Sequence, residues 1–427
     1  MNKNCFFLII VTFAIVFLSS TCQREEESNV QRIFDDQGVA IATPFLWKTS
    51  LHQKEPTSNS YIKNQIIYNN NIVVPTTNGE ESRALSLLNT IDGKILWSWD
   101  DIYKDHLEYI DVDYHHQYEN LFTFQIGGRG YCINLENGTT KWHHRRDRSF
   151  DVRMNSIDNL YFVIYGPIDN NSEKYHKDIT SFIGDIKTGI ISEFLTPNFT
   201  YENPDYWRGV QFINQIPNKD NLLLVSYFEN LEDYVIQPFF GLYDKDLDEW
   251  IWDRILITPP KHSNVIDWPP IIENNKIYAV VDNCVVCHDL ETGTQIWKRE
   301  FYGNFLFSGF LLEEGKVIAN CEDTYAYALD AENGNILWSV KTAGTSSRMS
   351  YLNGVVYMVG GSGGGRLFAI EASTGKMLWR IDAGLLGEGE GARFRTNAVY
   401  VLPAKDDQPA KVIALSDMYA YCFEAER

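Results

Sequence analysis

Basic residues are scarce in this sequence of 427 residues. It has 37 Lys and Arg against 57 Asp and Glu, so its formal net charge at pH 7 is −20. Proteins that bind nucleic acid hold the phosphate backbone with clustered Lys and Arg. The composition therefore argues against nucleic-acid binding, whereas the negative charge favours solubility.

The apolar run at the N-terminus is too short to cross a bilayer. It extends from Phe6 to Leu18, which is 13 residues, and Lys3 precedes it. This pattern is typical of an export signal, and Leu18-Ser19-Ser20-Thr21-Cys22 resembles a bacterial lipoprotein cleavage site. We therefore predict that residues 1–22 are a lipoprotein-type signal peptide and that Cys22 is lipidated. Ordinary secretory cleavage is the alternative.

A polar segment follows the predicted signal. Residues 23–37 begin with Gln23-Arg24-Glu25-Glu26-Glu27 and are predicted to form an acidic polar tether. A charge run of this kind is a solvated linker or, after a lipidated Cys, resembles a tag for the cell surface. The remaining residues, 38–427, are predicted to form one domain, because a continuous repeat runs through them.

A tryptophan motif recurs along that domain. An acidic residue or Asn ends a small-residue strand, a Gly follows four residues later, and a Trp lies four residues beyond the Gly. The clearest copies are Asp330/Gly334/Trp338 and Glu371/Gly375/Trp379. Others, some with substitutions, are Asn89/Gly93/Trp97, Asn134/Gly138/Trp142, Asp185/Gly189/Glu193, Asp244/Asp248/Trp252 and Asp289/Gly293/Trp297. Self-similarity at roughly 40 to 50 residues is typical of stacked supersecondary units.

Each repeat has room for four short strands. One unit predicts them at 348–351, 355–359, 366–371 and 376–381. Asn-Gly, Thr-Gly or Asp-Gly precedes the Trp strand, and these residues accept the positive φ of a hairpin turn. Four antiparallel strands repeated radially predict an all-β fold, a β-propeller.

The two ends of the chain are expected to complete one blade. The strand from Tyr419 to Glu424 aligns with Tyr325 to Asp330, but no Trp strand follows it. Phe45 to Thr49, which contains Trp47, looks like the missing strand. Pairing these segments predicts an eight-bladed propeller of four-stranded antiparallel blades, whose ring is closed by an N-terminal strand.

The repeat A-x-D/E-x-x-T/N-G-x-x-L-W resembles the pyrroloquinoline-quinone-type (PQQ-like) propeller repeat, most strongly from residue 276 to 383. Eight blades with a lipoprotein signal are similar to the propeller lipoproteins of the outer-membrane barrel-assembly machinery. This resemblance implies an outer-membrane lipoprotein on the periplasmic or the cell-surface side. It is specific for fold and weak for function, because the family includes quinone-dependent dehydrogenases, assembly scaffolds and sensors.

A quinone-dependent oxidoreductase is the first alternative function. The resemblance implies that such an enzyme holds its cofactor at the ring axis, with an ion bound by carboxylate and amide groups, and has a catalytic Asp and adjacent cysteines. The seven cysteines include no adjacent pair, and no such set of side chains stands out. We therefore expect no catalytic residue, no cofactor and no bound metal.

The segment Cys284-Val285-Val286-Cys287-His288 matches the attachment motif for c-type haem. The repeat offers a different interpretation, because aligning Asp289 with Asp330 places Cys287 in a slot for small residues. The same slot holds Cys132, Ala328, Ala369 and Cys422. Side chains alternate along a strand, so Cys284 and Cys287 should point to opposite faces, where they can neither share a haem nor form a disulfide.

Asp111, Asp113 and His115 alternate in the sequence and are predicted to share one inner strand. Carboxylate and imidazole groups can bind a metal ion, but three ligands on one strand are a weak signal. A solvated wall of the central channel is the favoured interpretation of these residues.

Two segments are candidates for binding a partner. The basic residues His143, His144, Arg145, Arg146 and Arg148 are predicted to lie in a loop that leaves an outer strand. Tyr201, Tyr206, Trp207 and Arg208 begin from the same kind of loop and have the side chains of interface anchors, although they could instead repack a degenerate blade.

The predicted function is a non-catalytic binding or scaffold lipoprotein of the bacterial cell envelope, which presents a rigid propeller face to a protein partner. A surface carbohydrate-binding protein is the second alternative. The repeated tryptophans are predicted to dock each blade onto the next: Trp47, Trp97, Trp142, Trp252, Trp297, Trp338 and Trp379.

Overall fold

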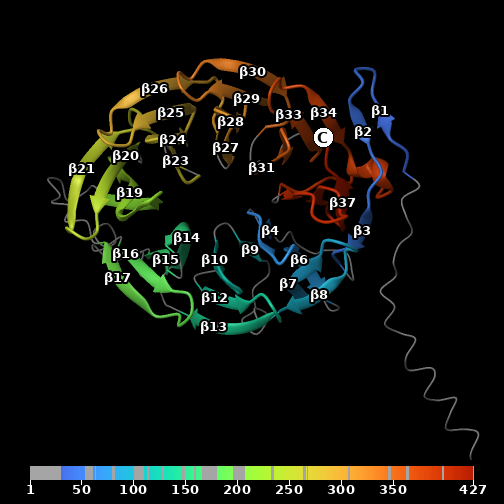
Figure 1. Cartoon of the computed structure of the whole chain (residues 1–427), viewed down its shortest axis with the longest axis horizontal. Coiled ribbons are helices and arrows are strands. Elements are labelled where there is room, and N and C mark those ends of the chain that lie inside the picture. Colours follow the sequence, from blue (N-terminus) through green and yellow to red (C-terminus); the bar gives the residue numbers. More distant parts are fainter. Residues whose placement is uncertain are drawn as a thin grey trace, which may run out of the picture.

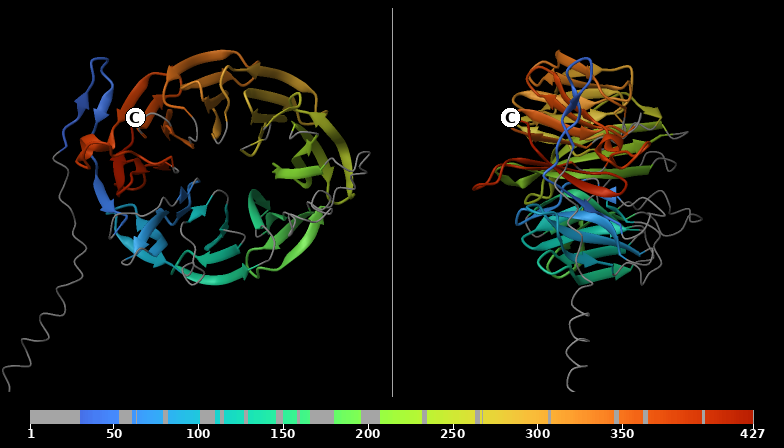
Figure 2. Two further views of the ribbon diagram at one scale, coloured as in Figure 1. Left: turned by 180° about the vertical axis from the view of Figure 1, so that it is seen from behind. Right: turned by 90° about the vertical axis from the view of Figure 1, so that its right-hand side faces the viewer.

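The computed structural model arranges sheets around a central axis as a closed disc (Figures 1 and 2). It describes residues 30–52, 61–62, 64–78, 82–100, 110–112, 115–126, 129–145, 150–157, 160–165, 180–195, 207–231, 235–262, 266, 268–305, 308–344, 348–361, 365–396 and 399–426. Cys22 and the predicted export signal lie outside these residues. Within them, no helix combines the length and apolar character needed to cross a membrane.

Eight of the sheets are blades, numbered here in chain order and each written from its inner to its outer strand. Blade 1 has β5 (Ile67–Tyr68), β6 (Asn71–Asn78), β7 (Ser82–Asn89) and β8 (Ile95–Trp99). Blade 2 has β10 (His115–Tyr118), β11 (Leu121–Ile126), β12 (Arg129–Asn134) and β13 (Thr139–Arg145). Blade 3 has β14 (Phe150–Ile157), β15 (Leu160–Tyr165), β16 (Thr180–Asp185) and β17 (Ile191–Leu195). Blade 4 has β18 (Trp207–Ile216), β19 (Lys219–Asn230), β20 (Val235–Asp244) and β21 (Glu249–Leu256), and β22 (Lys261–His262) also pairs with β20.

The second half of the chain continues the pattern. Blade 5 has β23 (Ile271–Glu273), β24 (Lys276–Val281), β25 (Cys284–Asp289) and β26 (Gln295–Glu300). Blade 6 has β27 (Phe310–Glu313), β28 (Lys316–Asn320), β29 (Tyr325–Asp330) and β30 (Ile336–Lys341). Blade 7 has β31 (Met349–Leu352), β32 (Val355–Val359), β33 (Leu367–Glu371) and β34 (Met377–Ile381). Blade 8 has β35 (Tyr400–Leu402), β36 (Lys411–Leu415), β37 (Tyr419–Glu424) and, as its outer strand, β3 (Trp47–Ser50).

Burial follows the position of a strand in its blade. In blade 5 the middle strands β24 and β25 are almost fully buried, because blades 4 and 6 cover both of their faces. The outer strand β26 is mostly exposed, and Trp297 is its buried residue. The core is therefore a series of apolar layers between blades, and each layer depends on contact with the next blade.

The N-terminal strand closes the ring as the sequence predicts. Strand β3 pairs antiparallel with β37, and Trp47 lies opposite Cys422. The chain also does something that the repeat does not predict: β2 (Ala40–Ala42) adds to the outer edge of blade 7, parallel to β34, and β1 (Ile33–Phe34) pairs with β2. Residues 33–50 therefore link blade 7 to blade 8 along the rim (Figure 1).

Two smaller elements complete the fold. Strands β4 (Tyr61–Ile62) and β9 (Asp111–Val112) form a parallel pair near the centre of the ring, and Ile62 and Val112 are buried there with the core of blades 1 and 2. A 3₁₀ helix, η3 (Ala383–Leu386), lies in the connection from blade 7 to blade 8.

Candidate functional site

The repeated tryptophans form the contacts between blades. In six of them the indole Nε1 donates to a main-chain carbonyl oxygen in the turn between the third and fourth strands of the next blade. The donor–acceptor pairs are Trp47–Thr90 (3.1 Å), Trp97–Leu135 (2.9 Å), Trp142–Ile186 (2.8 Å), Trp252–Leu290 (3.2 Å), Trp297–Ala331 (3.0 Å) and Trp338–Ala372 (2.9 Å). We call this arrangement the tryptophan docking contact.

The glycine of the motif lies directly under the indole ring. Gly375 has a φ of +74°, and a Cβ there would lie 2.7 Å from Cδ2 of Trp338. Gly334 has a φ of +70° and is equally close to Trp297. Only glycine accepts this backbone conformation and this close approach together, which explains why Gly and Trp recur at a constant spacing.

A second contact accompanies the first in several blades. The side chain two residues after the Trp reaches the carbonyl oxygen of the glycine: Thr49 Oγ1 donates to Gly93 (2.7 Å), Arg299 Nε donates to Gly334 (3.0 Å), and His144 Nε2 lies 2.6 Å from the Gly189 oxygen. This position does not stand out in the sequence, because its residue types differ from blade to blade. Only the shared spacing from the Trp could have indicated it.

The basic candidates are placed differently from the prediction. His143, His144 and Arg145 belong to β13 and do not lie in a loop, because the outer strand of blade 2 continues three residues past Trp142. His144 packs against Trp142 in a tilted arrangement, with ring centroids 5.0 Å apart, and is part of the docking contact with blade 3. His143 is exposed beside Tyr131 and remains available to a partner.

The other candidates are only partly described. Trp207 and Arg208 open β18, but their side chains are not described, nor is that of Arg145. Arg146, Arg148, Tyr201 and Tyr206 lie outside the described residues. The antiparallel strand order puts the end of each outer strand and the start of the next inner strand on one face of the disc. The end of β13 and the start of β18 therefore share that face.

The haem-like segment is a buried strand. Cys284 lies in the apolar layer shared with blade 4, and Cys287 lies in the layer shared with blade 6, so the two thiols point to opposite faces as predicted. Burial raises the pKa of Cys284 to about 11 and that of Cys287 to about 12. Both thiols are therefore protonated and unreactive at neutral pH.

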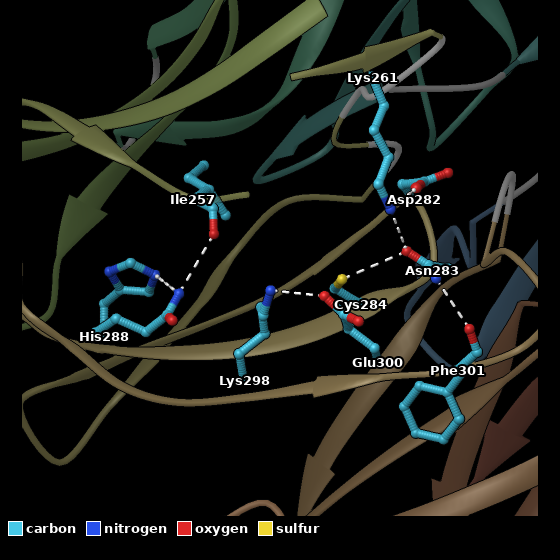
Figure 3. Close-up of polar contacts among 10 residues, drawn as sticks. Ile257, Lys261, Asp282, Asn283, Cys284, His288, Lys298, Glu300 and Phe301 are labelled. Atoms are coloured by element: carbon cyan, nitrogen blue, oxygen red, sulfur yellow. Dashed lines mark hydrogen bonds and ion pairs between the residues drawn. The ribbon is translucent and has the colours of Figure 1, made fainter. Parts of the chain in front are cut away.

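His288 is also held within the sheet. Its Nδ1 lies 2.9 Å from the carbonyl oxygen of Gly293. Its Nε2 lies 3.3 Å from the Gln295 amide, and Figure 3 shows this contact at the His288 ring. Burial lowers the pKa of His288, because the charged ring is disfavoured away from water. The strand pairing confirms that Cys287 and Ala328 occupy equivalent positions for small residues. Cys287 lies opposite Trp297, and Ala328 lies opposite Trp338.

Charged residues of blade 5 form ordinary ion pairs, one of them with β22 of blade 4. Lys261 donates to Asp282 and Asn283, and Lys298 donates to Glu300, as Figure 3 shows.

The expected strand of Asp111, Asp113 and His115 does not form, because Asp111 belongs to β9 and His115 opens β10. Asp113 lies outside the described residues. Among the residues that are described, no three His, Cys, Asp or Glu side chains gather as metal ligands.

Two of the motif copies depart from the rule. At the junction of blades 3 and 4, Glu193 occupies the tryptophan position of β17, and Asp248, with a φ of +57°, occupies the glycine position. Blade 4 fills this junction with its own aromatic residues. Trp250 packs on Tyr243 with ring centroids 5.2 Å apart, and Ile183 of blade 3 packs against the same apolar cluster.

These observations define the class: the chain is an eight-bladed β-propeller whose blades are joined by a tryptophan-and-glycine repeat. A family model described as "Outer membrane protein assembly factor BamB" matches residues 242–380 and 322–417, which together are less than half of the chain. The resemblance to the PQQ-like repeat is thereby confirmed. No curated protein matches the sequence.

Solved structures of very different proteins share the fold. BamB from Moraxella catarrhalis is 14% identical, with a TM-score of 0.53, over 86% of this chain and 99% of that one. The quinohemoprotein alcohol dehydrogenase ADHIIG from Pseudomonas putida is 12% identical, with a TM-score of 0.60, over 89% and 77%. Sqt1 from Saccharomyces cerevisiae is 10% identical, with a TM-score of 0.58, over 88% and 99%. At these identities the likeness shows the fold alone.

Proposed function

We propose that this protein is a non-catalytic scaffold of the bacterial cell envelope, lipidated at Cys22, which presents a rigid propeller face to a protein partner. The observation that carries the proposal is the chain of docking contacts around a closed ring. A surface held in this way is already ordered before a partner arrives. Binding then loses little conformational entropy.

The proposed surface is the face that contains the end of β13 and the start of β18. His143 is exposed there, and Arg145, Trp207 and Arg208 are provided by the same two strands. Arg146, Arg148, Tyr201 and Tyr206, which lie outside the described residues, are included in the proposed surface from the sequence. Arg and aromatic side chains are enriched where binding energy concentrates in protein interfaces. The similarity to the BamB family model supports a partner in the envelope.

Photo-crosslinking tests the proposal. A benzophenone amino acid replaces His143 or Trp207 in cells, and crosslinked proteins are identified by mass spectrometry. The matched control is Ser339, which is exposed and follows Trp338 in blade 6 as His143 follows Trp142 in blade 2. We expect one envelope protein to crosslink at His143 and Trp207 and not at Ser339. Equal labelling at all three positions would contradict the proposed surface.

Two further measurements separate the alternatives. Binding of pyrroloquinoline quinone with calcium can be measured by absorbance. Stoichiometric binding would support an oxidoreductase and contradict the scaffold function. Glycan binding that disappears in Tyr206→Ala and Trp207→Ala would replace it with a carbohydrate-binding protein. Fractionation of a Cys22→Ala variant tests the anchor, and we expect the variant to leave the membrane fraction.

A further inference from the structure

Closing the ring removes one turn from the repeat. In blades 5, 6 and 7 a turn with glycine joins the third strand to the fourth and lies under the tryptophan of the preceding blade. In blade 8 the third strand, β37, ends at Glu424, and the fourth strand, β3, comes from the other end of the chain. The tryptophan of blade 7, Trp379, therefore meets no such turn.

Side chains replace part of the missing turn. Trp379 Nε1 donates to Glu426 Oε1 at 2.5 Å, where the other tryptophans donate to a main-chain carbonyl oxygen. Arg32 pairs with the same carboxylate. The main-chain nitrogen of Glu426 donates to the hydroxyl oxygen of Tyr357 (2.9 Å). Glu426 is thus fixed over the edge of blade 7 by three different groups.

A cavity of about 490 Å³ lies at this junction. It is lined by residues 43–46, by Trp379, by residues 424–426 and by Arg32, and we call it the closure pocket. Its volume is in the range of small-ligand sites. Because the pocket lies where the two ends of the chain meet, the repeat itself does not predict it.

The lining of the closure pocket suits a cation on an aliphatic stem. Phe45 and Leu46 provide an apolar wall, and Leu46 is 43% exposed. Glu424 and Glu426 also line the pocket, and both Trp379 and Arg32 contact Oε1 of Glu426. Each carboxylate accepts several hydrogen bonds, so Glu426 can accept from a further donor besides Trp379 and Arg32. A long basic side chain places its methylene groups on an apolar wall and its charge on a carboxylate.

We propose that the closure pocket binds the basic side chain, Arg or Lys, of a partner protein. The net negative charge of the whole chain, −20, favours the approach of such a partner. The pocket is lined by residues of blades 7 and 8, whereas β13 and β18 belong to blades 2 and 4. The test of the closure pocket is therefore independent of the test of the function proposed above.

The test uses the purified protein and three probes: the peptide acetyl-Gly-Arg-Gly-amide, its Glu counterpart, and spermidine as a free amine. The signal is the indole N–H resonance of Trp379 in ¹H–¹⁵N spectra, assigned with Trp379→Phe. We expect the Arg peptide to shift this resonance and the Glu peptide to leave it unchanged. A shift with spermidine but not with the Arg peptide would show that the site binds a free amine and not a protein side chain. Equal shifts with the Arg and Glu peptides would show that the pocket does not select a basic side chain.

Matched variants test the residues. Glu426→Gln keeps an oxygen that accepts from Trp379 and removes the charge, so the Arg peptide should bind about tenfold more weakly. Its control is Glu332→Gln, the corresponding position in blade 6, where a glycine turn is present. Leu46→Arg places a guanidinium in the pocket and should abolish binding. Its control is Leu337→Arg, which changes the corresponding exposed residue before Trp338 and should leave binding of the Arg peptide unchanged.

Thermal melts show which variants are folded. Leu46 is exposed, so we expect Leu46→Arg to fold. This variant can therefore test the proposal even if Glu426→Gln fails to fold. If the Arg peptide binds Leu46→Arg as it binds the unchanged protein, the closure pocket is not its site.

Discussion

The junction of blades 6 and 7 and the junction of blades 3 and 4 are built differently. In the first, Trp338 lies on Gly375 and donates to Ala372. In the second, Glu193 and Asp248 replace the tryptophan and the glycine. Both junctions have to fill the wedge that opens between two twisted sheets as they splay outward.

Blade 4 fills its wedge from its own strands. The Tyr243 hydroxyl donates to Asp248, and Trp250 lies so close to Gly241 that a Cβ there would be 2.5 Å from Cζ3 of the ring. Burial raises the pKa of Tyr243 to about 12, and Asp248 shifts it in the same direction, so the hydroxyl remains a donor at neutral pH. The packing requirement is therefore for apolar volume at the junction, and the repeat motif is one way to supply it.

Of the changes described here, removing the closing strand should destabilise the ring most. Deleting residues 38–50 takes β3 from blade 8 and β2 from blade 7, so we expect loss of the cooperative unfolding transition in calorimetry. Deleting residues 30–36 removes only one strand, β1, with the ion pairs of Arg32 and Asp35, and is the control. A deletion of 38–50 that melts like the unchanged protein would contradict the role of closure.

Truncating the two tryptophans compares the junctions directly. Trp338→Ala should lower the free energy of unfolding by about 3–5 kcal/mol, because a buried ring and its hydrogen bond are both lost. Trp250→Ala should lower it by less, because Trp250 is only partly buried. Denaturant melts measure both values, and a larger loss for Trp250 would reverse the comparison.

A methyl group at the two turn positions should act differently. Gly375→Ala forces a Cβ against Trp338 and should destabilise by about 1–3 kcal/mol. Asp248→Ala adds no Cβ and loses the hydrogen bond from Tyr243, which should cost about 1 kcal/mol. Equal losses in urea melts would show that the glycine position is not set by the ring above it.

A buried histidine should make the regular junction of blades 4 and 5 sensitive to acid. Burial lowers the pKa of His288 in the folded state below its ordinary value of 6.5, so the unfolded chain takes up the proton first. Stability should therefore decrease as the pH falls below about 6.5. His288→Gln retains a donor for Gly293 and should reduce this dependence in melts at pH 7.5 and below. An unchanged pH profile would exclude His288 as its source.

The regular parts of the molecule are the parts that could be predicted. Residues 355–359 form a strand as expected, Trp47 completes blade 8, and Cys284 and Cys287 point to opposite faces, because all three follow from strand alternation and repeat spacing. The end of β13 was placed wrongly, because nothing in the spacing shows that a strand continues to Arg145. His144 looks like part of a basic patch in the sequence, whereas in space it contacts Gly189 of blade 3.

The sequence by itself determined the number of blades, the strands within them and the tryptophans that join them. Those features are local or periodic, so residue spacing is enough to specify them. Only the tertiary structure decided what happens where the period fails. Trp250 substitutes for a missing tryptophan, β2 extends blade 7, and Glu426 faces Trp379 beside the closure pocket, because each depends on contacts between segments that are distant in the chain or outside the repeat.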